Sequence, residues 1–165
     1  MNISCATEAD IDAIMALVRD AVRQKQMNGD DQWDDSYSDR ELIAQDVSSG
    51  TLFKITVEGE LAGIIVLNEE QPPPYFTVRW KDGGRPLVVH RLCIDPRFQR
   101  RGLARRLMLF AEEHAAANGY RSIRLDTYSG NHGAQALFES LDYLPVGDVS
   151  LREGKCFHCF KKMIG

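Results

Sequence analysis

The sequence lacks a hydrophobic run long enough to cross a bilayer, and its N-terminus lacks the basic and then apolar pattern of a signal peptide. Its longest apolar run, Leu61 to Leu67, is far shorter than the about 20 residues that a membrane helix needs. We therefore expect a cytoplasmic protein without membrane contact. Its 165 residues suffice for one core, so we expect residues 1–165 to form a single domain.

An excess of basic residues is also missing. The chain has 20 Lys and Arg residues against 24 Asp and Glu residues, which gives a net charge of -4. Proteins that bind nucleic acids usually carry a strong basic excess on the binding surface. We therefore expect no nucleic-acid partner.

Cysteine is scarce, because four residues in a chain of this size do not make a disulfide framework. Cys156 and Cys159 form a C-x-x-C pattern, which in other proteins can be a redox or metal pair. However, Lys155 to Met163 alternates like a strand, and side chains three positions apart on a strand point to opposite faces. The sequence also offers no second ligand pair to complete a zinc site, so we expect no metal.

Hydrophobic periodicity predicts an alternation of strands and helices. Strands are expected at Asn2–Ala6, Thr51–Val57, Leu61–Leu67, Leu87–Ile94, Ser122–Tyr128, Val146–Leu151 and Lys155–Met163. Helices are expected at Glu8–Gln26, from Ser38 to Gly50, at Gly102–Asn118 and at Asn131–Leu141. Two capping boxes, Thr7 with Asp10 and Ser38 with Glu41, mark the starts of the first two helices.

The order of these elements predicts an α+β sandwich around a mixed sheet. Glu58 to Glu60 is a hairpin turn between two strands. The stretch from Leu87 to Tyr128 is a strand-helix-strand crossover, so its two strands should be parallel neighbours. Gln71 to Pro86 contains three consecutive prolines, and we expect this segment, the proline-rich excursion, to be irregular.

The most informative stretch runs from Leu92 to Ala104. A strand ends at Asp95, a basic loop follows, and a helix opens at Gly102. A helix start offers unpaired backbone N–H groups and a positive dipole end, and glycine lets an anion come close to the backbone. The pattern is neither a P-loop nor a dinucleotide fingerprint, because the required Gly-Lys-Ser/Thr and the additional glycines are absent. With four nearby arginines, at 100, 101, 105 and 106, it predicts a phosphate-binding turn; the alternative is a solvated basic helix start.

Gln99-Arg100-Arg101-Gly102-Leu103-Ala104 resembles the Q/R-x-x-G-x-G/A signature of the GNAT superfamily of N-acetyltransferases. The segment Leu92 to Pro96 resembles the fourth strand of that family. Asn131, Ala134, Leu137 and Phe138 fall on its downstream N-x-x-A-x-x-L-Y pattern. The element order fits over nearly the whole chain. The resemblance implies a mostly antiparallel mixed sheet whose fourth and fifth strands splay apart around the pantetheine arm of the cofactor.

The resemblance also implies an activity: transfer of the acetyl group of acetyl-CoA to a primary amine of a small molecule or peptide, by direct attack in a ternary complex. The backbone of Leu92 and Ile94 would hold pantetheine, and one of those amides could polarise the thioester carbonyl. Asn131 either contacts the cofactor or caps its helix. The implied cofactor-binding residues are Leu92, Cys93, Ile94, Arg100, Arg101, Gly102, Leu103, Ala104, Asn131 and Phe138.

Two positions depart from the family pattern. Val88 stands where the family often has a glutamate base, but His90 lies two residues on and should share its face. An imidazole, with an ordinary pKa of about 6.5, is a competent base at neutral pH; the alternative is a structural histidine. Phe138 stands where many members carry the acid tyrosine, so we expect Tyr128, with Tyr143 as the alternative, to serve as acid. A thiol pKa of about 8.5 also allows the thiolate to leave without an acid.

The acceptor pocket is the least specified part of the sequence. The resemblance implies that the early helices and the connection between the third and fourth strands build it, which suggests Trp33, Tyr37 and Tyr75. Aromatic and acidic residues there suit a cationic amine, although a solvated polar loop is the alternative. Two rival functions stay open: a non-catalytic regulatory module that binds CoA or acyl-CoA, and the same fold acting on a longer acyl-CoA. The protein is expected to be a monomer or a homodimer.

Overall fold

A computed structural model describes residues 1–27, 39–151 and 154–165 of the chain. The chain divides into two compact units. Unit 1 comprises Met1–Leu67 and His90–Phe110, and unit 2 comprises Asn68–Val89 and Ala111–Gly165. The prediction that the chain forms one domain stays a prediction.

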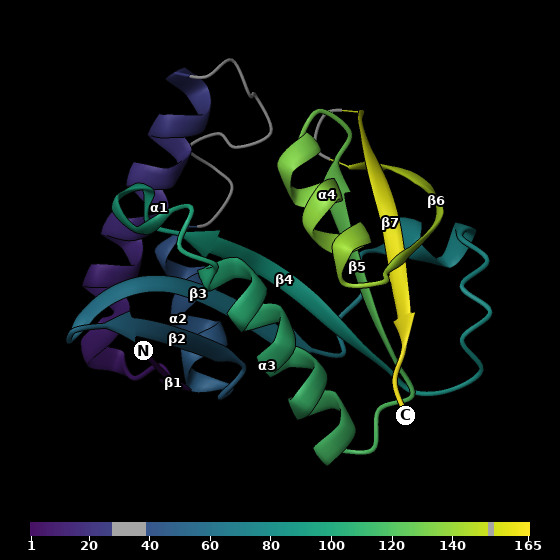
Figure 1. Cartoon of the computed structure of the whole chain (residues 1–165), viewed down its shortest axis with the longest axis horizontal. Helices are drawn as coiled ribbons and strands as arrows, with labels where there is room; N and C mark the ends of the chain where they lie inside the picture. Colours follow the sequence, from purple (N-terminus) through teal and green to yellow (C-terminus); the bar gives the residue numbers. More distant parts are fainter. Residues whose placement is uncertain (28–38, 152–153) are drawn as a thin grey trace. The chain divides into compact units, whose positions relative to one another are not determined.

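Unit 1 holds the first helices and the N-terminal strands (Figure 1). Its elements are β1 (Asn2–Cys5), the 3-10 helix η1 (Glu8–Asp10), α1 (Ile11–Met27), α2 (Arg40–Ser48), β2 (Leu52–Val57) and β3 (Glu60–Asn68). It also contains the end of β4 (Pro86–Ile94), the 3-10 helix η3 (Pro96–Phe98) and the start of α3 (Leu103–Ala117). Antiparallel pairing joins β1 to β2 and β2 to β3, so the predicted hairpin is confirmed.

Capping side chains fix where the first two helices begin. The backbone N–H of Thr7 donates to the Asp10 carboxylate at 2.8 Å, as the first predicted capping box requires. The second helix is capped by Asp39, whose carboxylate accepts the N–H of Leu42 at 2.8 Å. The predicted cap of that helix, Ser38, lies outside the described residues.

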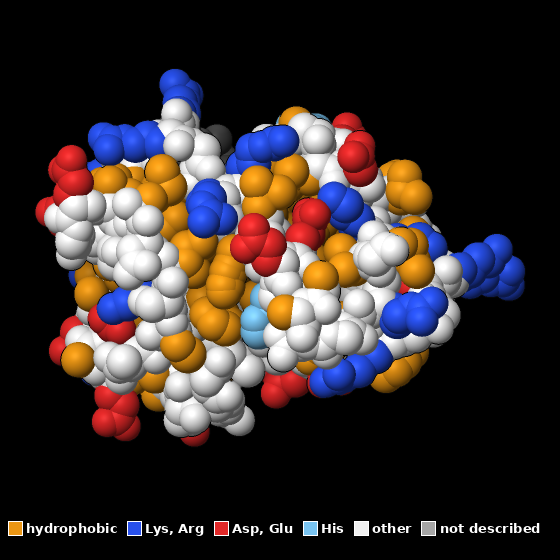
Figure 2. Space-filling view, turned by 60° about the horizontal axis from the view of Figure 1, so that its bottom comes forward, with side chains coloured by type: hydrophobic (Ala, Val, Ile, Leu, Met, Phe, Trp, Pro, Cys, Tyr) orange, Lys and Arg blue, Asp and Glu red, His pale blue; other side chains and the backbone are white. Residues whose placement is uncertain are grey.

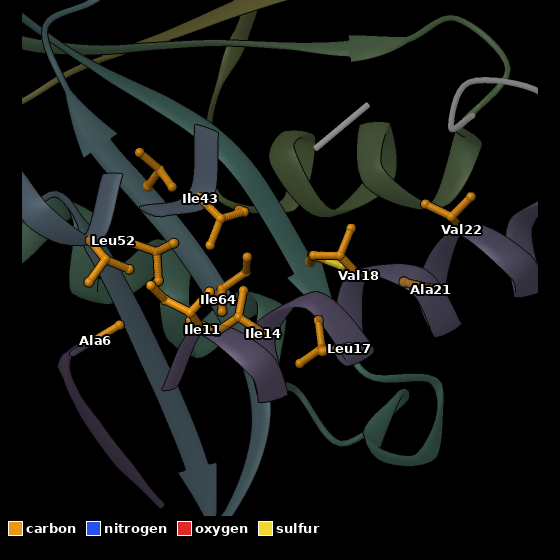
Figure 3. Packing of buried hydrophobic residues seen from close by; sticks show 13 residues of the cluster. Ala6, Ile11, Ile14, Leu17, Val18, Ala21, Val22, Ile43, Leu52 and Ile64 are labelled. Atoms are coloured by element: carbon orange, nitrogen blue, oxygen red, sulfur yellow. The ribbon is translucent and has the colours of Figure 1, made fainter. Parts of the chain in front are cut away.

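The core of unit 1 forms where α1 and α2 pack on the sheet (Figure 3). The apolar residues of α1 recur at intervals of three and four, so they share the face that contacts the sheet. The cluster consists of Ala6, Ile11, Ile14, Leu17, Val18, Ala21, Val22, Ile43, Val47, Leu52, Ile64, Val66 and Cys93. Cys93 is the member contributed by β4, so packing holds the end of this strand against the two helices.

Unit 2 contains the C-terminal strands, with β7 between β5 and β6 (Figure 1). Its elements are the 3-10 helix η2 (Pro73–Thr77), the start of β4, the end of α3, β5 (Ser122–Tyr128), α4 (His132–Ser140), β6 (Leu144–Leu151) and β7 (Lys155–Met163). Both neighbours of β7 are antiparallel to it, in registers that run from Ser122 opposite Met163 and from Leu144 opposite Lys161.

A buried ion pair ties the proline-rich excursion to β5. The guanidinium of Arg124 donates to both carboxylate oxygens of Asp82, each at 2.7 Å, and the hydroxyl of Ser122 donates to the same carboxylate at 2.7 Å. Asp82 is 4% exposed, and these donors lower the pKa of its carboxyl group although burial alone would raise it. The excursion is therefore an anchored part of unit 2.

The strand order is β1-β2-β3-β4-β5-β7-β6 in one seven-stranded sheet. Strands β4 and β5 are parallel, with Pro86 opposite Ser122 and Val88 opposite Arg124, which confirms the predicted crossover. In the described ranges of the chain, this mixed sheet with four α-helices confirms the predicted α+β class. The residues of β4 from His90 onward belong to unit 1 and those of β5 to unit 2, so the splay of the two strands stays a prediction.

The distribution of charge, the apolarity of the helices and the exposure of the cysteines bear on three of the predictions. On the face seen in Figure 2, Lys and Arg side chains are interspersed with acidic and uncharged ones and form no continuous basic surface. Within the described ranges, the structure has no helix with the length and apolarity of a membrane span. Cys159 is buried and Cys156 exposed, so the C-x-x-C side chains do point to opposite faces.

Candidate functional site

Strand β4 ends at a buried carboxylate, Asp95. The backbone N–H of Asp95 donates to the carbonyl oxygen of Ala62 at 2.8 Å, and its carboxylate accepts the backbone N–H of Arg97 at 2.9 Å. These bonds begin η3, and Phe98 at the end of η3 is buried. The chain therefore leaves the sheet from a fixed point, and the turn that follows is anchored at its start.

The turn at Gln99 to Gly102 leads into α3. The carbonyl oxygen of Gly102 accepts the N–H of Arg106 at 3.0 Å, which is the first bond of the helix. Arg100 and Gly102 have φ values of 64° and 77°, in the left-handed region that glycine adopts with little strain. Gln99 to Gly102 are exposed, whereas Leu103 is buried and holds the helix start in place.

This turn has the properties of an anion-binding site. The first N–H groups of a helix have no intrahelical acceptor and carry the positive end of the helix dipole. A Cβ atom added at Gly102 would meet no atom within 4 Å, so a ligand can come close to the backbone there. Exposed arginine side chains stand on both sides of the glycine, at 100, 101, 105 and 106. Backbone, charge and open space all fit a diphosphate group.

Strand β4 carries a backbone irregularity at Arg91, whose φ is 51°. A left-handed conformation costs a non-glycine residue about 1–2 kcal/mol, so the surroundings must hold it. The Arg91 guanidinium donates to the Asp46 carboxylate of α2, with Nε–Oδ2 and Nη2–Oδ2 distances of 2.8 and 2.7 Å. Both side chains are mostly buried, at 14% and 7% exposure. The ion pair therefore anchors the part of β4 that carries His90 and Leu92.

Beyond this irregularity, β4 packs closely on β3. A Cβ atom at Gly63 would lie 2.6 Å from Cδ1 of Ile94 and 3.0 Å from the carbonyl oxygen of Cys93, so only glycine fits. Burial raises the pKa of the Cys93 thiol to about 12, so this group is protonated at neutral pH and is no nucleophile. Any contact of Cys93 with a ligand must come from its backbone, because its side chain belongs to the core.

In unit 2, the predicted acid Tyr128 is half-buried, with its ring 5.7 Å from that of Phe157. The alternative acid, Tyr143, is buried and donates to Glu112 at 3.2 Å; burial and the negative charge of Glu112 raise the pKa of its hydroxyl well above the ordinary value. The Tyr143 hydroxyl is therefore bound to a carboxylate of unit 2, and its role as an acid stays a prediction. Phe138 is also buried, with its ring 5.8 Å from that of Phe160.

Asn131 caps α4, because its side-chain oxygen accepts the N–H of Ala134 at 3.1 Å. Tyr75 is buried, and its hydroxyl donates to Asp126, whose charge together with burial raises the pKa of Tyr75 well above 10.0. Ligand roles for Asn131 and Tyr75 stay predictions. Trp33 and Tyr37, the other predicted acceptor residues, lie outside the described residues.

Unit 1 thus contains His90, Leu92, Cys93 and Ile94 on β4 and the turn from Arg100 to Ala104. Unit 2 carries Tyr75, Tyr128, Asn131 and Phe138. The Asp46–Arg91 pair did not emerge from the sequence, because 45 positions separate its members. The available signal was Arg91 itself, a charged residue inside a mostly apolar strand.

Comparison with known proteins identifies the fold and the family. Residues 14–143 match the model of the acetyltransferase (GNAT) family. The chain is 23% identical over 163 residues to the uncharacterized N-acetyltransferase YesJ of Bacillus subtilis, covering 96% of this chain and 88% of that protein. A GNAT-family acetyltransferase structure from Streptococcus agalactiae is 26% identical, with a TM-score of 0.86 and coverage of 99% and 95%.

A further structure, yncA from Salmonella typhimurium with its cofactor acetyl-CoA, is 17% identical with a TM-score of 0.76, and covers 100% of this chain and 94% of its own. At that identity the likeness supports the fold alone. The family match, in contrast, spans most of the sequence and includes the turn at Gly102. The chain belongs to the GNAT family of N-acetyltransferases.

Proposed function

We propose that the protein transfers the acetyl group of acetyl-CoA to a primary amine of a small molecule or peptide, by direct attack within a ternary complex. The observation that carries this proposal is the exposed turn from Gln99 to Gly102, which leads from η3 into α3 and offers helix N–H groups and arginines. The family uses acetyl-CoA, and the turn suits its diphosphate.

The residues of unit 1 supply the donor half of the site. Backbone N–H groups from Arg100 to Ala104 bind the diphosphate, and the backbone of Leu92 to Ile94 binds the pantetheine arm. Acetyl-CoA supplies an acyl group already activated as a thioester. A backbone N–H of β4 then polarises the carbonyl oxygen, where a preorganised donor is most effective. The Asp46–Arg91 pair keeps this backbone in place.

In this proposal, His90 and Tyr128 carry out the two proton transfers of the reaction. An amine attacks only when neutral, and a lysine-like amine has an ordinary pKa of about 10.4, so most of it is protonated at neutral pH. His90, half-buried on β4, accepts the amine proton directly or through water. Tyr128 donates a proton to the leaving thiolate. Phe138 cannot do so, because its ring has no ionisable group and lies in the core of unit 2.

Recognition of the acceptor amine rests on Trp33, Tyr37 and Tyr75 in this proposal. Aromatic faces attract a cationic amine before it loses its proton. Because Tyr75 is buried and bound to Asp126, its contribution is to shape the η2 segment. Asn131 and Phe138 of α4 are the remaining cofactor-binding residues in this proposal, and the protein acts in the cytoplasm as a monomer or homodimer.

Replacing Gly102 by glutamate tests the diphosphate site. The new side chain places bulk and negative charge where the phosphates dock, so affinity for acetyl-CoA should fall at least about tenfold, roughly the size of one charge-assisted contact. Isothermal titration calorimetry with acetyl-CoA measures this change.

Gly119→Glu is the matched control. Gly119 follows the other end of α3, shares a φ of 77° with Gly102, and also has no atom within 4 Å of an added Cβ. Backbone strain and added charge are therefore equal in the two variants. Equal acetyl-CoA affinity in both variants would show that the diphosphate does not bind at the Gly102 turn.

A further inference from the structure

Three side chains that bind transition metals meet on the hairpin of β6 and β7. Asp148, Cys156 and His158 each offer one ligand atom, and these atoms all lie within 4.8 Å of one another. Nδ1 of His158 is 2.6 Å from Oδ1 of Asp148. None of the three has a role in the proposed acetyl transfer.

Strand register explains why the three side chains meet. Asp148 lies directly opposite His158 in the antiparallel ladder, and Ser150 lies opposite Cys156. Cys156 and His158 are two residues apart on β7, so they share the face on which Asp148 also stands. Sequence spacing alone does not reveal this group, because Asp148 comes from the neighbouring strand.

The opposite face of the hairpin is fixed by packing. Val149, Phe157 and Cys159, which alternate with the three ligands, are buried in the core of unit 2. The ligand-bearing face is open, because Asp148 and Cys156 are exposed and His158 is partly exposed. The hairpin therefore holds the donors on a rigid backbone while an ion and water can enter.

The donor set selects the kind of ion. A thiolate, an imidazole and a carboxylate together suit Zn²⁺, whereas Mg²⁺ and Ca²⁺ prefer sites made of oxygen. In a tetrahedral zinc site the ligand atoms lie about 3.3–3.8 Å apart, so small rotamer changes would bring the three side chains to the spacing of zinc ligands. We propose that Asp148, Cys156 and His158 form a three-residue Zn²⁺ site with its fourth position open to water.

The test is metal binding by the full chain without a histidine tag, after chelator treatment under reducing conditions. Titration calorimetry with ZnCl₂ should show one saturable equivalent. Co²⁺ in place of Zn²⁺ should give the near-ultraviolet charge-transfer absorption of a metal–thiolate bond. Cys156→Ser should abolish that absorption, and Cys156→Ser, His158→Ala and Asp148→Asn should each weaken Zn²⁺ binding at least about tenfold.

Cys5→Ser is the control, because Cys5 is also an exposed free cysteine but lies in unit 1. It should bind Zn²⁺ and Co²⁺ like the parent protein. Circular dichroism should show all variants folded, since the substituted side chains do not belong to the core. Either of two results would overturn the site: no saturable equivalent of Zn²⁺, or binding that survives unchanged in both Cys156→Ser and His158→Ala.

Discussion

Replacing His90 by glutamine is expected to lower kcat by about 10²–10⁴ at neutral pH, the usual contribution of a general base. Glutamine keeps the polarity and approximate size of the side chain but accepts no proton usefully. Affinity for acetyl-CoA should stay close to that of the parent protein, because the turn from Arg100 to Ala104 is unchanged. Raising the pH should recover part of the rate, since more of the acceptor amine is then neutral.

Steady-state rates against pH, with acetyl-CoA affinity measured separately, test the role of His90. The acidic limb of the parent profile should lie within about one unit of 6.5, the range in which histidine titrates, and should be absent in His90→Gln. His114→Gln is the control, because His114 is also partly buried but has no proposed role. A near-normal rate with the same acidic limb in His90→Gln would make His90 a structural residue.

Replacing Asp46 by asparagine is expected to lower the free energy of unfolding by about 3–5 kcal/mol, because it leaves the mostly buried Arg91 guanidinium without a charged partner. Acetyl-CoA affinity should fall as well, because Arg91 has a left-handed φ that its surroundings must hold. Urea unfolding and titration calorimetry measure the two effects.

Two further variants separate this ion pair from general surface charge. Asp12→Asn breaks the pair with Arg40 in the same unit, where the side chains are 86% and 61% exposed, and should cost less than about 1 kcal/mol. Adding Arg91→Gly to Asp46→Asn removes the unpaired charge and places glycine at a φ that suits it, so stability should partly return. Equal stability of Asp46→Asn and Asp12→Asn would contradict the anchoring role.

Local patterns in the sequence were sufficient for most elements. The predicted bounds of β5 and β7 match the structure, because turn residues flank both strands. The cap of α2 was predicted one residue too early, at Ser38 in place of Asp39, since both are good capping residues and only the backbone geometry distinguishes them. The phosphate-binding turn was predictable because its glycine, arginines and following helix are contiguous.

Features that depend on contacts between distant segments were not predictable. The Asp46–Arg91 pair needs the packing of α2 on β4, and the group around His158 needs the register of β6 on β7. Burial likewise altered the interpretation of Tyr75 and Tyr143, which the sequence presented as possible site residues: both side chains are buried, and their hydroxyls donate to partly exposed carboxylates. The identity of a residue does not reveal which charged side chains lie next to it in the folded chain.

A turnover screen tests most directly whether the protein transfers the acetyl group of acetyl-CoA to an amine. The protein is incubated with acetyl-CoA and a panel of small amines, polyamines and peptides, while released CoA and acetylated product are both quantified. At least one amine should accelerate CoA release above the rate of hydrolysis, with one acetylated amine formed for each CoA. Tight acetyl-CoA binding without amine-dependent CoA release across the panel would contradict acetyl transfer and favour a module that binds acyl-CoA without turnover.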